Sequence, residues 1–342
     1  MRWSLIWLLL LFACTQKSQE PYTIIWENGR AMGVSFDREL GDDLVLLVKG
    51  SPFPVMGKFE PRLNRIVFTP EVHLERGLTY VLYTSKTKST LSFTIPADSL
   101  NKDPTLLGHY PSCDTVPSNL LKIYLSFSEP MMEGRSSQYV LLFDNDGRPI
   151  RNAFLDLQPE LWNEDGTVLT LWLDPGRIKQ DLIPNKDLGT VLNDNHTYRL
   201  MIAEGWRSKQ GLALKSTYEK TFTTTKRDVF RPNLNTWSVI ANRDTIFINT
   251  HESLDWSLLN SAVTIWSGDK EIGAKTISEP CERHFVMIPD QKLSAGNYTV
   301  NIEARLEDLA GNNLNRLFET DVTGHQDDSQ TKEVYTISFR VD

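Results

Sequence analysis

Short runs of four to eight residues, rich in Val, Ile, Thr, Tyr, Phe and Trp, recur along this chain of 342 residues. Gly, Pro, Asn or Asp separates one run from the next, and helical periodicity is nearly absent. This pattern is typical of β-strands joined by turns. It predicts an all-β fold built from β-sandwich modules, and the length is enough for two or three of them.

Two polar breaks that contain proline divide the pattern, at Ala97–Pro104 and Lys226–Pro232. They predict three β-sandwiches in series, over residues 22–100, 104–226 and 232–342. Proline in each break would limit the flexibility of the linker. The expected strands are Tyr22–Trp26, Leu44–Lys49, Arg65–Thr69, Thr79–Thr84, Thr90–Ile95, Leu121–Ser126, Tyr139–Phe143, Val168–Leu173, Thr197–Ala203, Lys220–Thr225, Thr245–Asn249, Ala262–Trp266, His284–Ile288, Tyr298–Ala304, Leu317–Val322 and Val334–Val341.

The first fourteen residues have the layout of an export signal. Arg2 supplies a positive start, and the apolar run Leu5–Ala13 ends at Cys14. At roughly ten residues this run is too short for a transmembrane helix, which needs about 20. Leu11–Cys14 resembles a bacterial lipobox, in which the Cys thiol is lipidated and becomes the new N-terminus. The resemblance implies a signal peptide over residues 1–13, lipidation of Cys14 and a polar tether over residues 14–21.

A diacylglyceryl group on Cys14 would supply two acyl chains, which is what stable membrane attachment requires. In such lipoproteins, an Asp directly after the lipidated Cys tends to retain the protein at the inner membrane. Thr15 occupies that position here, so we expect the protein at the outer membrane. Whether the body faces the periplasm or the outside stays open. The competing interpretation of Cys14 is an ordinary cysteine in an uncleaved leader.

Several segments carry a family resemblance. Phe127–Met131 reads Phe-Ser-Glu-Pro-Met, and Gly296–Val300 is followed by Leu309–Asn312. These segments resemble secreted bacterial immunoglobulin-like domains of the S-layer-associated (Big_5-like) type, over roughly residues 104–325. The resemblance implies the fold and an exported location. It implies no reaction, because such domains serve as spacers, stalks and ligand-binding modules.

Charge and cysteine content narrow the class of protein further. The net charge of −8, from 36 basic and 44 acidic residues, argues against nucleic acid or an anionic lipid surface as the partner. Cys113 and Cys281 lie about 170 residues apart and in different predicted modules. A disulfide between them would have to join two modules, so we expect two separate buried thiols.

No set of residues predicts catalysis, a metal or a cofactor. Asp144–Gly147 begins like a calcium loop but lacks the later ligands, so it predicts a hairpin turn. Asp308 with Asn312 and Asn313 predicts a turn network, with a bound cation as the alternative. The histidines are scattered singly, without the spacing of a zinc site; they are His73, His109, His196, His251, His284 and His325.

Trp162 and Trp206 flank polar turns and are therefore the candidates for contact with a ligand. Packing in the core is the competing interpretation, and the one we favour. Glu160, Glu164 and Asp165 lie beside Trp162, as a sugar site would require, although a solvated hairpin tip explains them more simply.

The sequence thus predicts a lipid-anchored envelope protein without enzymatic activity, in which Ig-like modules form a stalk or bind a protein or glycan partner. The alternative is a carbohydrate-binding accessory protein or glycan hydrolase that acts through Trp162 and the nearby carboxylates.

Overall fold

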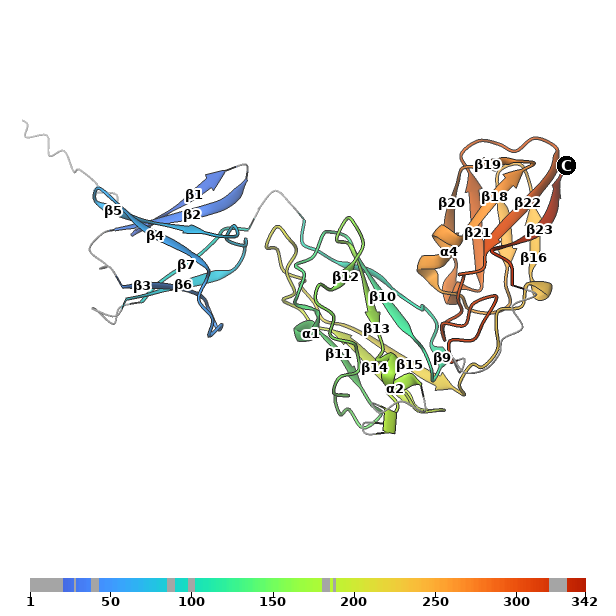
Figure 1. Ribbon diagram of the computed structural model, residues 1–342, viewed down its shortest axis with the longest axis horizontal. Helices are drawn as coiled ribbons and strands as arrows, with labels where there is room; N and C mark the ends of the chain where they lie inside the picture. The colour runs from blue at the N-terminus through green and yellow to red at the C-terminus, as the bar shows by residue number, and fades with distance from the viewer. Residues whose placement is uncertain are drawn as a thin grey trace, which may run out of the picture. The chain divides into compact units, whose positions relative to one another are not determined.

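The computed structural model describes residues 21–27, 29–37, 43–84, 90–97, 102–179, 185–186, 189–319 and 331–342. The predicted leader (1–13), Cys14 and His325 lie outside the described residues. The chain divides into two compact units, Met1–Leu100 and Asn101–Asp342. Figure 1 shows the strands of each unit.

In the first unit, the described strands form two antiparallel sheets, β1-β2-β5-β4 and β3-β6-β7. The side chains alternate between inside and outside, as in β6, where Tyr80 and Leu82 are buried. Phe36, Phe68 and Phe93 fill the core between the sheets. The strands are β1 (Tyr22–Glu27), β2 (Arg30–Asp37), β3 (Leu44–Val48), β4 (Gly57–Arg62), β5 (Arg65–Pro70), β6 (Thr79–Thr84) and β7 (Thr90–Thr94).

The second unit contains two sandwiches, each with its own core. The second sandwich of the chain has sheets β12-β13-β10-β8 and β11-β14-β15-β9, in which β9 pairs parallel to β15. Its elements are β8 (Leu106–Tyr110), β9 (Thr115–Pro117), β10 (Lys122–Phe127), α1 (Ser136–Tyr139), β11 (Val140–Phe143), β12 (Leu161–Trp162), β13 (Val168–Trp172), α2 (Pro175–Ile178), β14 (Thr197–Ile202) and β15 (Tyr218–Thr225).

The third sandwich has sheets β16-β17-β21-β20 and β19-β18-β22-β23. The last strand, β23, pairs along its whole length with β22. The elements are η2 (Leu234–Thr236), β16 (Ser238–Ala241), β17 (Ile246–Asn249), α4 (Trp256–Ala262), β18 (Val263–Ser267), β19 (Lys270–Ile272), β20 (Ala274–Ser278), η3 (Pro280–Glu282), β21 (His284–Pro289), β22 (Gly296–Glu303) and β23 (Val334–Val341).

Paired sheets over a buried core confirm the predicted fold class, all-β with tandem Ig-like β-sandwiches. The predicted strands coincide with observed ones to within a few residues, except for Leu317–Val322. The described part of that segment forms a turn, and residues 320–322 lie outside the described residues.

The sequence pattern missed several strands, β2 and β4 among them, and it missed the helix α4. Strand β4 contains Pro61, which lacks a backbone N–H and is accepted because β4 lies at the edge of its sheet. Helix α4 begins after Asp255, whose side chain accepts a hydrogen bond from the Leu258 N–H. Seven residues are too few for a clear helical period.

Candidate functional site

The second and third sandwiches meet at a joint that a disulfide closes. Cys113 and Cys281 are bonded, with 4.5 Å between their Cα atoms across 168 residues of sequence. The expectation of two separate thiols is therefore wrong. It failed because it assumed that the modules are independent, whereas the loop before β9 and the turn η3 lie against each other.

An ion cluster lies beside the disulfide in this joint. The Lys122 ammonium is 3.0 Å from the Asp255 carboxylate and 2.7 Å from that of Glu307. Burial lowers the pKa of Lys122, but the two carboxylates outweigh burial and the pKa rises above its ordinary value. The Tyr124 hydroxyl donates to Asp255 at 2.7 Å. Burial, followed by the charge of Asp255, raises the pKa of Tyr124, so this phenol stays protonated.

Aromatic rings and a buried carboxylate extend the joint. The Tyr110 ring stacks on Trp256, the first residue of α4, with centroids 4.1 Å apart. Glu282 is fully buried, and both its oxygens accept hydrogen bonds from the Ser112 N–H, at 3.1 and 3.2 Å. Burial is the main cause of the raised pKa of Glu282. The Cys281 N–H donates to the Ser112 hydroxyl at 2.8 Å, so both residues after Pro280 bond across the joint.

The segment after β22 forms the last part of the joint. The Asp308 carboxylate accepts hydrogen bonds from the backbone N–H groups of Ala310 and Asn312 and from the Asn312 amide. This is the predicted turn network. Burial nevertheless raises the pKa of Asp308 to about 7. Gly311 has φ +82°, and a Cβ there would lie 2.4 Å from the Leu121 side chain, so only glycine fits at this close approach.

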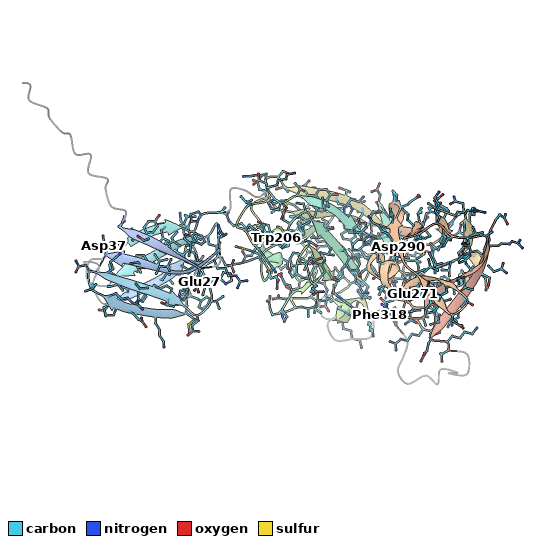
Figure 2. All side chains as sticks on the ribbon, turned by 90° about the horizontal axis from the view of Figure 1, so that it is seen from above. Glu27, Asp37, Trp206, Glu271, Asp290 and Phe318 are labelled. Carbon is cyan, nitrogen blue, oxygen red and sulfur yellow. A yellow bond between two sulfur atoms is a disulfide. The ribbon has the colours of Figure 1, made fainter. Side chains whose placement is uncertain are left out.

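These contacts make the second and third sandwiches one body. Leu309 and Phe318, from the third sandwich, pack against the core of the second; Phe318 is labelled in Figure 2. Charged groups buried in this way are stable only when they are paired. The Lys122 ammonium binds the carboxylates of Asp255 and Glu307, while Glu282 and Asp308 accept hydrogen bonds from backbone N–H groups, so this geometry holds the two sandwiches together.

The two candidate tryptophans lie together in the second sandwich, with their rings in an edge-to-face contact at 5.8 Å. Trp206 is 0% exposed, and its indole N–H donates to the Met132 carbonyl at 3.1 Å. Figure 2 labels it among the elements of this sandwich. Trp206 therefore cannot stack on a ligand, and its candidacy was wrong. Trp162 is half-buried and also packs against the core.

Glu160, the carboxylate nominated beside Trp162, serves the local fold. It accepts hydrogen bonds from the N–H groups of Gly134 and Ser136, both at 2.8 Å, and from the Trp162 indole at 2.9 Å. Burial raises its pKa, but these donors outweigh burial and the pKa lies below its ordinary value. A glycosidase acid needs the opposite, a raised pKa that keeps the proton at neutral pH.

A pocket of about 330 Å³ opens beside Glu160, between β11 and β13. Its walls are mainly aliphatic, and Leu155 and Leu161 are about 40% exposed there. The sequence pattern missed this pocket, because its walls come from two strands in different sheets, β11 and β13, and from the chain between them, which come together only when the sandwich packs.

The remaining predicted features are structural. Asp144 accepts from the N–H groups of Asp146 and Arg148, which confirms the hairpin turn. Among the described residues, no group of three His, Cys, Asp or Glu side chains could hold a metal ion. His109 is bonded to the Tyr218 hydroxyl, and burial lowers its pKa to about 4. No helix in the described ranges is both long and apolar enough to cross a membrane.

Comparison with known proteins gives no family. No family model matches the chain, and no curated protein sequence matches it. Similar solved structures include an I-band fragment of titin, with 11% identity, 87% of each chain covered and a TM-score of 0.19. Native alpha-2-macroglobulin from Escherichia coli has 12% identity, 69% of this chain and 71% of that chain covered, and a TM-score of 0.25. The insect immune protein hemolin has 10% identity, coverage of 87% and 66%, and a TM-score of 0.20. At these scores the likeness carries no argument about function.

Proposed function

We propose that the chain is an exported, lipid-anchored envelope protein, without catalytic activity, that presents a rigid two-sandwich body to a protein or glycan partner. The observation that carries this proposal is the disulfide between Cys113 and Cys281. Disulfides persist in oxidising compartments outside the cytosol, so the bond favours export. The leader that ends at Cys14 provides the signal for export and the lipid for attachment.

A body held by a disulfide and a buried ion cluster can present its surface to a partner in a fixed arrangement. Surface features keep a fixed spacing when the two modules that carry them cannot rotate. The aliphatic pocket beside Glu160 is the place in the second sandwich where we expect an apolar group of the partner to bind. Leu155 and Leu161 would be its exposed contacts.

The anchor is tested by mass spectrometry of the mature protein isolated from its native envelope. We expect loss of residues 1–13 and a diacylglyceryl thioether on Cys14. A Cys14→Ala variant should keep the leader and lack the diacylglyceryl thioether. An unmodified Cys14, or cleavage at another position, would refute the lipid anchor.

The partner is tested by affinity capture with the anchored protein, comparing the native chain with Leu155→Asp and Leu161→Asp variants. A specific partner should be lost with these variants. Turnover of a glycan by the purified protein would overturn the non-enzymatic assignment and favour the alternative, a glycan hydrolase.

A further inference from the structure

A groove of about 330 Å³ runs between the second and third sandwiches, on a part of the joint that is open to solvent. One wall consists of β9 and the chain that leaves β15, from Thr225 to Asp228. The other wall consists of His251–Ser253 and Arg283. Ligand sites are commonly of this size and commonly lie between domains.

Cations without a carboxylate partner reach the groove from both walls. Lys226 and Arg283 have no carboxylate within 4.0 Å among the described residues, and both are exposed. Arg283 is held at the groove by a hydrogen bond from its Nε to the Ser253 hydroxyl at 3.2 Å. Arg227 also lines the groove, but Glu319 neutralises it at 2.6 Å. Lys226 and Arg283 thus line the same groove, and neither forms an ion pair with a described residue.

The two acidic residues that line the groove, Asp228 and Glu252, each accept a hydrogen bond from a backbone N–H group. An Asp228 carboxylate oxygen accepts from the Phe230 N–H at 3.0 Å, and one of Glu252 accepts from the Asn233 N–H at 2.9 Å. Burial raises the pKa of Glu252, which disfavours its charge.

The disulfide fixes the spacing of the two walls. Cys113 comes two residues before Thr115 in one wall, and Cys281 comes two residues before Arg283 in the other. His251, on the rim, has φ +59°, a conformation that is uncommon for a residue other than glycine and often found where a ligand is held. The groove is therefore preorganised, so binding would require little ordering of either wall.

We propose that this groove is an oxyanion site, which binds a phosphate or carboxylate group of a larger ligand through Lys226 and Arg283. Both side chains donate charge-assisted hydrogen bonds to such oxygens, and Arg283 can do so through two N–H groups. The site goes beyond the proposed anchoring and presentation, and its test does not depend on them.

Isothermal titration calorimetry on the full chain tests the site with three probes. Pyrophosphate presents phosphate groups, trigalacturonate presents carboxylates and maltotriose is neutral. We expect saturable binding of at least one anionic probe and none of maltotriose. The tighter anionic probe identifies the group that the ligand carries. Absence of binding by both anionic probes would overturn the proposal.

Substitutions then locate the binding. Lys226→Gln and Arg283→Gln should each weaken the anionic probe by roughly tenfold, since each removes one charged donor. Lys270→Gln, at an exposed position in β19, makes the same change of charge away from the groove and should leave binding unchanged. The site would be refuted if the Lys226→Gln/Arg283→Gln double variant bound the anionic probe as tightly as the native chain. It would also be refuted if Lys270→Gln lost as much affinity as the groove variants.

Discussion

Removing the disulfide measures how strongly the second and third sandwiches depend on each other. In a Cys113→Ala/Cys281→Ala variant, the unfolded chain regains the freedom of a loop of 168 residues. Loop-closure entropy for that length corresponds to about 5 kcal/mol at room temperature, as an upper value. Domain stabilities are commonly about 5–15 kcal/mol. We therefore expect a loss of several kcal/mol, shared by both sandwiches because the bridge links a residue of one to a residue of the other.

Urea unfolding of the full chain, followed by tryptophan fluorescence, measures this loss. Trp162, Trp172 and Trp206 lie in or against the second core and Trp237 lies in the third, so variants that keep the tryptophans of one core alone report on each sandwich separately. Dithiothreitol should lower the midpoint of the native protein to that of the double variant and leave the variant itself unchanged. A loss below about 1 kcal/mol, or destabilisation of only one sandwich, would show that the bridge does not couple the two cores.

Three further changes test the packing and charges of the same unit. Trp206→Ala should lower the free energy of unfolding, measured in urea, by about 3–5 kcal/mol. The matched control is Phe230→Ala, at a side chain that is 76% exposed, which should change it by less than about 0.5 kcal/mol. Asp255→Ala removes a buried partner of the ion cluster and the cap of α4, and it should lower the free energy of unfolding by about 3–5 kcal/mol. Asp244→Ala breaks an exposed ion pair and should lower it by less than about 1 kcal/mol. Equal losses in the two variants would contradict the argument that burial makes the cluster important. Because the folded-state pKa of Asp308 is raised to about 7, its contribution to stability is full below the unfolded pKa and falls by up to about 4 kcal/mol as the pH rises from about 4 to about 7. Asp308→Asn should flatten the stability–pH curve measured by urea unfolding in that window, and an unchanged slope would refute the raised pKa.

Much of the fold could be predicted because alternation is a local property. Strands such as β6 and β13 can be predicted from their own residues, since buried and more exposed positions alternate along each strand. Strand β4 could not be found in this way, because Gly57 and Pro61 are poor strand formers that only an edge position tolerates. The turn at Asp144–Gly147 was predictable for the same local reason: the Asp144 side chain accepts a hydrogen bond from the backbone N–H of Asp146, two residues further on.

The joint could not be predicted, because its contacts are not local. Lys122, Asp255 and Glu307 are ordinary charged residues in sequence, and only the packing of two sandwiches makes them a buried cluster. Trp206 is the opposite case. Its polar neighbours made it a candidate for ligand contact beside the favoured interpretation of core packing, and the turn that carries them folds the indole into the core.

Because the joint is fixed, loss of the disulfide should change the affinity of a ligand that contacts both sandwiches and not that of a ligand that contacts one. A ligand in the groove contacts walls from both sandwiches, so breaking the bridge adds the cost of ordering those walls to the cost of binding. A ligand in the pocket between β11 and β13 contacts the second sandwich alone. Removal of the disulfide should therefore weaken an oxyanion in the groove and leave an apolar ligand in the pocket unaffected. If both affinities fell together, the bridge would act by supporting the second sandwich and not by setting the spacing of the groove.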